Sequence, residues 1–410
     1  LRHVRTVEHP YDQLEAIYVL PREPEPARLT GIRLKSSARL AERIERYAET
    51  LKESGVQFHA LELNGKTIVD ESEIRRMFYE EYRSLPLPKR VNAVRSRLNE
   101  MVKERIKKHA SALYRKLLKE PKYLGTEQEL KRMSVVRAQK TFAPLRAFVA
   151  SCGFLDVIGT YVGMLRHFAG FSTDEGGEAE KWKIVADDTE LRLNSGERLP
   201  FEDAVPVLYL LEVLHGASRM NRMKHVIIDE AQDYTPLQWA YLRRLFPNAG
   251  FTAVGDARQE IRGFEAEGGL TNLPDIFPAE DTMTVNLTKS YRSTRQLVAF
   301  TRSMLPDGHA VEPFERDGEK PDVTVMEEDC PLETYAVRIG NRILSWREEG
   351  VSSIAIITKT AEERDEAHKW LSAAGIAAKK IEKETVRLPS GPVVLPSYLA
   401  KGLEFDNVVV

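Results

Sequence analysis

Short apolar runs that alternate with helical stretches fill the second half of the sequence, and this alternation constrains the fold more than any other feature. Strands that alternate with helices favour a parallel sheet covered by helices, in which ligands bind beyond the carboxyl ends of the strands. The expected strands lie at 225–228, 251–254, 284–287, 323–326 and 354–357, and the expected helices at 201–215, 236–246, 332–348 and up to 374. We therefore predict an α/β fold with two parallel-sheet units in this half of the chain.

The length and composition of the chain exclude several classes of protein. Its 410 residues exceed what one hydrophobic core usually holds, so we expect two or three packing units. A hydrophobic fraction of 42% and a charged fraction of 30% exclude a disordered chain and a membrane bundle. We find no apolar run near the roughly 18 residues of a membrane span and no secretion leader. With only Cys152 and Cys330, a disulfide framework or zinc finger is not expected, and we predict a cytoplasmic protein without membrane association.

The first half of the chain is predicted to be mostly helical and carries no chemical motif. We expect a helix at 36–53, a hairpin around Asn64-Gly65 and a helix at 70–82. Between Lys89 and Lys122, twelve Lys or Arg stand against three Glu, on a helix with the apolar stripe Val91, Val94, Leu98 and Met101. Because the net charge of the whole chain is only -2, any nucleic-acid affinity must come from such a local patch. This helix either presents a solvated face or binds nucleic acid or an acidic protein.

Two adjacent acids, Asp229 and Glu230, end the first apolar strand of the second half. Phosphoryl-transfer enzymes need one carboxylate that holds Mg²⁺ and one that polarises a water, and this arrangement supplies both. Strands also end in acids that only cap the next helix, so the pair alone does not decide between the two interpretations.

Three further motifs follow the acidic pair in order. Together the four resemble motifs II to V of the UvrD-like superfamily 1 helicases, over about 180 residues. They are Asp229-Glu230-Ala231-Gln232-Asp233, Val254-Gly255-Asp256-Ala257-Arg258-Gln259, Ser290-Tyr291-Arg292-Ser293-Thr294 and Ala400-Lys401-Gly402-Leu403-Glu404-Phe405-Asp406. The resemblance implies two RecA-like parallel-sheet domains of the P-loop NTPase type, incomplete at both ends, with a large and mostly helical insertion.

The resemblance also implies roles in the use of ATP and Mg²⁺. Asp229 would bind Mg²⁺, Glu230 would activate the attacking water, and Gln259 would sense the γ-phosphate. Tyr291 would stack on the adenine, and Arg292 would reach the γ-phosphate from the junction of the two α/β units.

Four more residues receive roles from the same resemblance. Glu404 would touch the ribose, with Lys401 and Gly402 shaping the loop beside it. Phe264 falls where the family carries an aromatic residue that stacks on a base of a nucleic acid, although Gly263-Phe264-Glu265 matches that neighbourhood loosely. Phe264 is equally well interpreted as a core residue.

The sequence departs from the family at its two ends. A phosphate-cradling loop needs Gly-x-x-x-x-Gly-Lys-[Ser/Thr], whereas the only Gly-Lys-Thr, at Gly65, has Ala60 in place of the first glycine and lies in an expected hairpin. The chain starts at Leu1 and stops at Val410, before the position of the family's last arginine motif. We therefore expect a piece of a longer protein, with the phosphate loop and that arginine outside it.

Within the family, the stretch from Glu73 to Arg90 resembles the HelD branch, whose members associate with bacterial RNA polymerase. Residues 229–236 also suit that branch, in which a helical arm is inserted into the first motor domain. The resemblance implies a domain order of 1–30, the remainder of the first RecA-like domain or a connector; 31–200, the inserted arm; 201–290, the first RecA-like domain; and 291–410, a truncated second one.

Three functions remain open from the sequence. The first is a HelD-type ATPase that releases stalled RNA polymerase from nucleic acid. The second is a translocase or helicase that moves 3′ to 5′ along single-stranded DNA, acting in repair. The third is a polymerase-binding module without motor activity.

Overall fold

The computed structural model describes residues 6–20, 26–119, 126–171, 177–196, 198–216, 219–261, 273–305, 311–325, 332–385 and 387–410. The chain divides into two compact units, unit 1 (Leu1–Ile276) and unit 2 (Phe277–Val410). None of the helices in the described ranges combines the length and apolar composition that a membrane span requires. The α/β fold class is confirmed, and the number of RecA-like domains and the proposed domain boundaries stay predictions.

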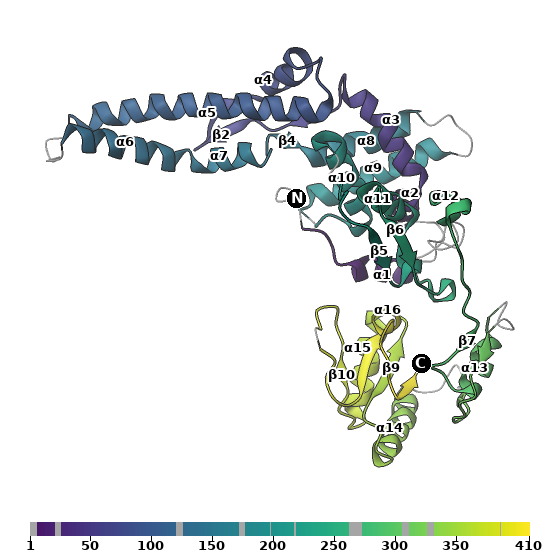
Figure 1. Cartoon of the computed structure of the whole chain (residues 1–410). Coiled ribbons are helices and arrows are strands. Elements are labelled where there is room, and N and C mark those ends of the chain that lie inside the picture. The colour runs from purple at the N-terminus through teal and green to yellow at the C-terminus, as the bar shows by residue number, and fades with distance from the viewer. Residues whose placement is uncertain are drawn as a thin grey trace. The chain divides into compact units, whose positions relative to one another are not determined.

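Helices make up most of unit 1 (Figure 1). Its helical body contains α1 (Pro10–Val19), α2 (Ala27–Ser36), α3 (Arg39–Leu51), α8 (Val157–Phe171), α9 (Glu178–Asn194) and α10 (Phe201–His215). Helix α3 forms because apolar residues recur on one of its faces, and Leu40, Ile44 and Leu51 are fully buried there. This face packs against α8 and α10. The helix predicted at 36–53 is confirmed, with its start at Arg39.

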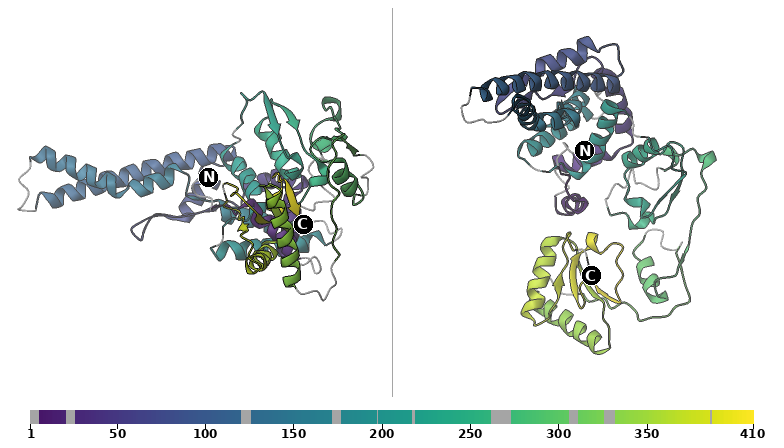
Figure 2. Two further views of the ribbon diagram at one scale, coloured as in Figure 1. Left: turned by 90° about the horizontal axis from the view of Figure 1, so that it is seen from below. Right: turned by 60° about the vertical axis from the view of Figure 1, so that its left-hand side comes forward.

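A long helical arm extends from this body, with a group of short elements before it. These are β1 (Gln57–Phe58), β2 (Leu61–Leu63), β3 (Lys66–Val69), α4 (Glu71–Arg76) and the π-helical turn η1 (Met77–Glu81). The arm itself consists of α5 (Leu87–Leu117), α6 (Glu127–Thr141) and α7 (Ala143–Ala150), after which β4 (Leu155–Asp156) returns to pair with β1. Figures 1 and 2 show α5 and α6 side by side and projecting from the body, and the two helices pack on each other.

The apolar stripe of α5 is confirmed as its packing face. Val91, Val94 and Leu98 are buried, and Val102 continues the stripe one turn further. The hairpin predicted around Asn64-Gly65 is also confirmed, because β2 and β3 pair antiparallel and both turn residues have positive φ, 51° and 72°. The Gly-Lys-Thr at Gly65 therefore lies in a hairpin turn and not between a strand and a helix.

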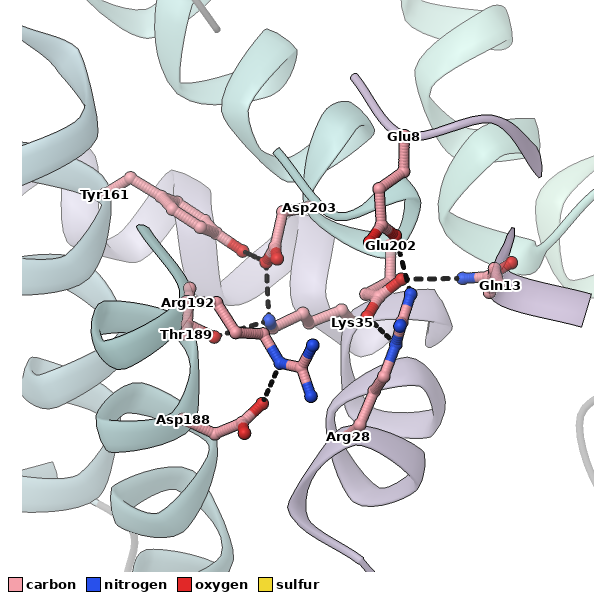
Figure 3. A network of polar contacts seen from close by, with 10 residues as sticks. All are labelled: Glu8, Gln13, Arg28, Lys35, Tyr161, Asp188, Thr189, Arg192, Glu202 and Asp203. Carbon is pink, nitrogen blue, oxygen red and sulfur yellow. Dashed lines mark hydrogen bonds and ion pairs between the residues drawn. The ribbon is translucent and has the colours of Figure 1, made fainter. Parts of the chain in front are cut away.

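Buried ion pairs and hydrogen bonds connect α2 to α10 and α9 (Figure 3). The ammonium group of Lys35 pairs with Asp203 and donates to the Thr189 hydroxyl at 2.8 Å, and the Tyr161 hydroxyl donates to the same carboxylate. Burial and the neighbouring Asp203 raise the pKa of Tyr161 well above its usual value.

A second set of contacts continues this network towards the N-terminal segment. Arg28 pairs with Glu202 at 3.3 Å and with Glu8 at 2.6 Å, while Gln13 donates to Glu202 at 3.2 Å. Burial and the neighbouring Asp203 raise the pKa of Glu202, and Arg28 opposes that shift.

The last part of unit 1 is a parallel strand pair. Strands β5 (His225–Ile228) and β6 (Gly250–Ala253) are joined through α11 (Pro236–Leu245), with the 3-10 turns η2 (Ala231–Asp233) and η3 (Ala257–Gln259) after the strands and α12 (Leu273–Ile276) at the end. Helix α11 begins at a capping box formed by Thr235 and Gln238, and its Trp239 is fully buried. Both strands and the helix between them lie within one or two residues of their predicted positions.

Unit 2 contains a four-stranded parallel sheet in the order β10-β11-β9-β12. Its elements are η4 (Ala279–Asp281), β7 (Lys289–Ser290), α13 (Arg295–Arg302), β8 (Glu312–Pro313), α14 (Leu332–Glu348), β9 (Ile354–Thr358), α15 (Ala361–Ala373), β10 (Lys379–Lys380), β11 (Val393–Pro396), α16 (Ser397–Ala400) and β12 (Asn407–Val409). The strand predicted at 354–357 and the helices on either side of it are confirmed.

Two predicted strands of unit 2 are wrong within the described residues. The stretch 284–287 is irregular, with Val285 67% and Leu287 90% exposed, and the described part of 323–326 is irregular too, with Val325 91% exposed. Neither stretch has a partner strand in the described part of the chain. An alternating apolar pattern forms a strand only where a hydrogen-bonded neighbour is available, so propensity alone does not decide the outcome here.

Candidate functional site

The acids predicted to serve phosphoryl transfer stand at the carboxyl end of a parallel strand pair. Ile228 is level with Ala253 in the ladder, so Asp229 follows β5 where Val254 follows β6. The two loops are hydrogen-bonded to each other, since Val254 N–H donates to the Ile228 carbonyl at 2.8 Å and Ala231 N–H to the Val254 carbonyl at 2.9 Å. This edge is where ligands bind in parallel α/β sheets.

Glu230 turns sharply out of the strand. Its backbone is left-handed, with φ 48° and ψ 43°, a conformation that costs a non-glycine residue about 1–2 kcal/mol. Its N–H donates to Asp229 Oδ1 at 2.9 Å, and both carboxylates are exposed. The strained turn therefore presents two adjacent carboxylates to solvent at the strand end.

Gln232 links the acidic loop to the loop after β6. This side chain is 2% exposed, its Nε2 donates to Glu230 Oε2 at 2.7 Å, and its Oε1 accepts from Asp256 N–H at 3.1 Å. Gly255 makes room for this contact, because a Cβ atom there would lie 2.3 Å from Gln232 Oε1. Sequence reasoning quoted Gln232 and Gly255 as motif members but assigned them no role, although an amide and a glycine in adjacent loops are the signal for such a contact.

Gln259 lies on the same edge as the acids. Asp256 orders its turn, accepting from Arg258 N–H and from Gln259 Nε2, both at 3.0 Å. The structure thus brings Asp229, Glu230 and Gln259 to adjoining loops of unit 1, coupled through Gln232 and Asp256.

Apart from Phe264, the remaining predicted site residues lie in unit 2. Arg292 forms an ion pair with Glu404 at 3.3 Å, with both side chains largely exposed, and its carbonyl accepts from Arg316 Nη1 at 3.1 Å. The ring centroid of Tyr291 lies 5.1 Å from that of Phe314, and Tyr291 is 63% exposed. The ion pair brings together two motifs of unit 2 whose members Arg292 and Glu404 lie 112 positions apart in the sequence.

The loop that contains Lys401 and Gly402 begins where α16 ends. Leu403 N–H donates to the Ala400 carbonyl at 3.0 Å, which closes a tight turn, and Gly402 has φ +77°. A glycine suits this left-handed position, whereas a residue with a Cβ atom would be strained there. The sequence-predicted Phe264 lies outside the described residues.

The donor set at Asp229 suits a magnesium ion that is shared with a nucleotide. Among the described residues no group of three or more His, Cys, Asp or Glu could enclose a metal ion. Mg²⁺ in nucleotide sites is held by one or two carboxylates together with phosphate oxygens and waters, and the exposed Asp229 fits that use.

Comparison with known proteins identifies the family. The model of the UvrD/REP helicase N-terminal domain matches residues 35–268, more than half of the chain. The chain belongs to this UvrD-like helicase family. The match includes most of the helical body, the arm and the loops that hold Asp229 and Gln259, so the arm is part of the matched region.

Curated relatives match over shorter stretches. The ATP-dependent DNA helicase UvrD1 of Mycobacterium tuberculosis (strain ATCC 25618 / H37Rv) is 30% identical over 152 residues, 33% of this chain and 19% of that protein. The RecBCD enzyme subunit RecB of the same strain is 34% identical over 93 residues, 22% of this chain and 8% of RecB. The ATP-dependent DNA helicase srs2 of Schizosaccharomyces pombe is 30% identical over 89 residues, 21% of this chain and 10% of srs2. The chain therefore spans about a fifth of the length of UvrD1 and a tenth or less of the lengths of RecB and srs2.

Proposed function

We propose that this chain supplies part of the ATP-hydrolysing machinery of a UvrD-like motor. The observation that carries the proposal is the coupling of Glu230 to the loop of Gln259 through the buried Gln232 amide. Such a link transmits a shift of a few tenths of an ångström at a phosphate to the neighbouring loop, because a buried and doubly hydrogen-bonded amide has little freedom to move. Two of the named relatives, UvrD1 and srs2, are ATP-dependent DNA helicases, which agrees with this use.

In the proposed mechanism each carboxylate has one task. Asp229 holds Mg²⁺, which when bound neutralises charge on the phosphate oxygens of ATP. Glu230 accepts a proton from the attacking water, and the hydrogen bond from Gln232 keeps its carboxylate at a fixed position. Gln259 responds to the γ-phosphate. The family resemblance assigns Tyr291 as an adenine platform, Arg292 as a γ-phosphate ligand, and Glu404, with Lys401 and Gly402 beside it, as a ribose contact.

We assign the motor to the HelD type, whose parent protein would bind bacterial RNA polymerase and use ATP to release stalled polymerase from nucleic acid. The support is the stretch from Glu73 to Arg90, which spans α4, η1 and the start of α5 and thus forms the base of the arm. Arg90 is 4% exposed there and donates to the carbonyls of Leu85 and Lys52, so this base is rigidly built. A rigid base suits an arm that must transmit force to a partner.

A DNA translocase is the second candidate, favoured by the named relatives UvrD1 and srs2. A polymerase-binding module without motor activity is the third. The candidates differ in their partners and in their response to salt, since electrostatic binding to DNA weakens steeply as salt rises.

The discriminating experiment uses this protein, purified bacterial RNA polymerase and single-stranded DNA at a series of salt concentrations. The HelD-type function predicts capture of polymerase at a salt concentration that abolishes retention of DNA on a filter. Retention of DNA with no capture of polymerase would favour the translocase. The first function is separated from the third by introducing Glu230→Gln into a form of the protein that also carries a phosphate loop. A motor then loses its ATP-dependent release of polymerase, whereas the polymerase binding of a module without motor activity is unaffected.

A further inference from the structure

A second segment of unit 2, residues 312–318, lies along the loop that holds Tyr291 and Arg292, and we call it the support segment. It begins in strand β8, which pairs parallel with β7 directly before that loop. Beyond the paired residues, Phe314 N–H donates to the Ser290 carbonyl at 3.2 Å. The strand pairing therefore sets the support segment beside the loop at the point where the two predicted nucleotide contacts begin.

Arg316 joins the support segment to the loop through both its side chain and its backbone. Its Nη1 donates to the Arg292 carbonyl at 3.1 Å, and its own carbonyl accepts from Arg295 N–H at 2.8 Å. A hydrogen bond from a guanidinium group to a carbonyl is charge-assisted, which makes it stronger than a bond between neutral groups. The backbone on both sides of residues 293–294 is thus bonded to one residue of the support segment.

Phe314 of the support segment lies against Tyr291, the ring that the family resemblance assigns to the adenine. The two ring centroids are 5.1 Å apart and the ring planes meet at 43°, which is within the range of favourable aromatic pairs. Phe314 is 41% exposed and Tyr291 63% exposed, so this pair lies at the surface and not in a hydrophobic core. The contact restricts the side-chain rotamers that are open to Tyr291.

The last residues of the support segment contact the start of α13. Gln296 Nε2 donates to Asp317 Oδ1 at 3.1 Å, and Gly318 N–H donates to Gln296 Oε1 at 2.9 Å. A Cβ atom on Gly318 would lie 2.4 Å from Thr294 Cγ2, so the two segments approach more closely than a larger residue allows. Thr294 is the N-cap of α13 and accepts from Leu297 N–H. The support segment therefore contacts the loop from the strand before it to the helix after it.

We propose that the support segment positions the two nucleotide-contacting residues of the loop. Arg316 fixes the backbone of Arg292, and its removal lets that guanidinium group move away from the γ-phosphate. Phe314 fixes the ring of Tyr291. Both Arg316 and Phe314 are positioning residues, because each acts through a neighbour, and the inference rests on the proposed function for the roles of those neighbours. A displacement of about 1 Å in a reacting arrangement can lower a rate by about a hundredfold, so such positioning has a measurable effect.

The first measurement is amide hydrogen exchange of the full chain without nucleotide. Arg316→Ala should speed exchange at the Arg295 amide by about fivefold, because one hydrogen bond fewer holds the support segment to the loop. The matched control is Arg347→Ala, which removes an exposed arginine side chain from α14 and should leave the Arg295 amide unchanged. Exchange in β9 should be the same in all forms, which shows that the sheet of unit 2 stays folded. Unchanged exchange at Arg295 in Arg316→Ala would overturn the inference.

The second measurement is steady-state ATP hydrolysis by a form of the protein that also carries a phosphate loop. Arg316→Ala should lower kcat about tenfold with little change in KM. Phe314→Leu should raise KM about threefold with little change in kcat, because the adenine platform is less well ordered. Arg316→Lys should recover most of the lost kcat, since lysine still supplies the one N–H donor that the carbonyl needs. A segment with only a structural role would change KM and kcat together in both alanine and leucine variants.

Arg292→Ala in the same assay separates a failure of this inference from a failure of the proposed function. If Arg292→Ala lowers kcat and Arg316→Ala does not, the positioning role is overturned while the proposed function stands. If Arg292→Ala leaves kcat unchanged, the role assigned to Arg292 is wrong and the inference fails with it. An Arg316→Lys variant that hydrolyses ATP no faster than Arg316→Ala would also overturn the positioning role, because a single hydrogen bond to a carbonyl does not require the planar guanidinium group.

Discussion

At the scale of single residues, Glu230 combines a strained backbone with the chemistry assigned to its side chain. A left-handed conformation favours glycine, because a Cβ atom at that position crowds the neighbouring carbonyl. We expect Glu230→Gly to be about 1 kcal/mol more stable than Glu230→Ala in urea unfolding of the full chain. The same pair of changes at Asp229, which has no positive φ, is the control, and there alanine should be at least as stable as glycine. Equal midpoints for the two Glu230 variants would mean that the turn is not left-handed in solution.

Substitutions of the adjacent residues Tyr291 and Arg292 should change different kinetic constants of ATP hydrolysis. Base stacking is present before and during the reaction, so Tyr291→Ala should raise the KM for ATP with little change in kcat. A guanidinium that meets the γ-phosphate mainly in the reacting arrangement acts on kcat, and Lys should replace Arg292 poorly because it lacks the planar fork. The assay needs a form of the protein that carries a phosphate loop. Equal effects of the two alanine variants on KM and kcat would refute the assignment. The ion pair from Arg292 to Glu404 is exposed and adds little stability, so loss of folding should not obscure the result.

At the scale of elements, the buried pair of Lys35 and Asp203 holds helix α2 against α10. Removal of one partner leaves a buried charge without compensation, which typically costs 3–5 kcal/mol. We therefore expect Lys35→Met to lower the free energy of unfolding by about 3–5 kcal/mol, and the double change with Asp203→Asn to recover much of it.

The matched control for this pair is Lys52, which bonds Glu49 at 2.5 Å on the surface of α3 and the turn after it. Lys52→Met should cost no more than about 0.5 kcal/mol, because exposed ion pairs three or four residues apart contribute little. Urea unfolding of unit 1 monitored at the buried Trp182 and Trp239 measures both variants. A small cost for Lys35→Met would show that the pair is solvated in solution and that α2 is held by apolar packing alone.

Element by element, the sequence indicated most of the local structure and failed where structure depends on distant partners. The hairpin at Asn64-Gly65 and the strand ahead of Asp229 follow from local rules that hold here. The stretch at 284–287 has the composition of a strand but has no ladder in the described residues. The π-helical turn at Met77 and the buried pairing of Lys35 with Asp203 could not be predicted, since helical spacing does not reveal where a turn widens or which buried charges meet. In the candidate site, the position of Asp229 and Glu230 directly after a strand was predictable and their catalytic roles stay predictions, whereas the bridge through Gln232 required the geometry of two loops.

At the scale of the whole molecule, the position of Gly65-Lys66-Thr67 bears on whether these residues can hydrolyse ATP. A phosphate loop works because successive backbone N–H groups at a strand-to-helix turn surround the β- and γ-phosphates. In this chain the glycine is instead the second turn residue of the antiparallel β2–β3 hairpin, and β3 follows it directly. No complete Gly-x-x-x-x-Gly-Lys-[Ser/Thr] occurs anywhere in the 410 residues. We expect residues 1–410 alone to show no steady-state ATP hydrolysis above background, with or without nucleic acid, and Lys66→Ala to change nothing. Turnover by these residues that Glu230→Gln abolishes would contradict this expectation, because it would mean that other groups of the chain surround the phosphates.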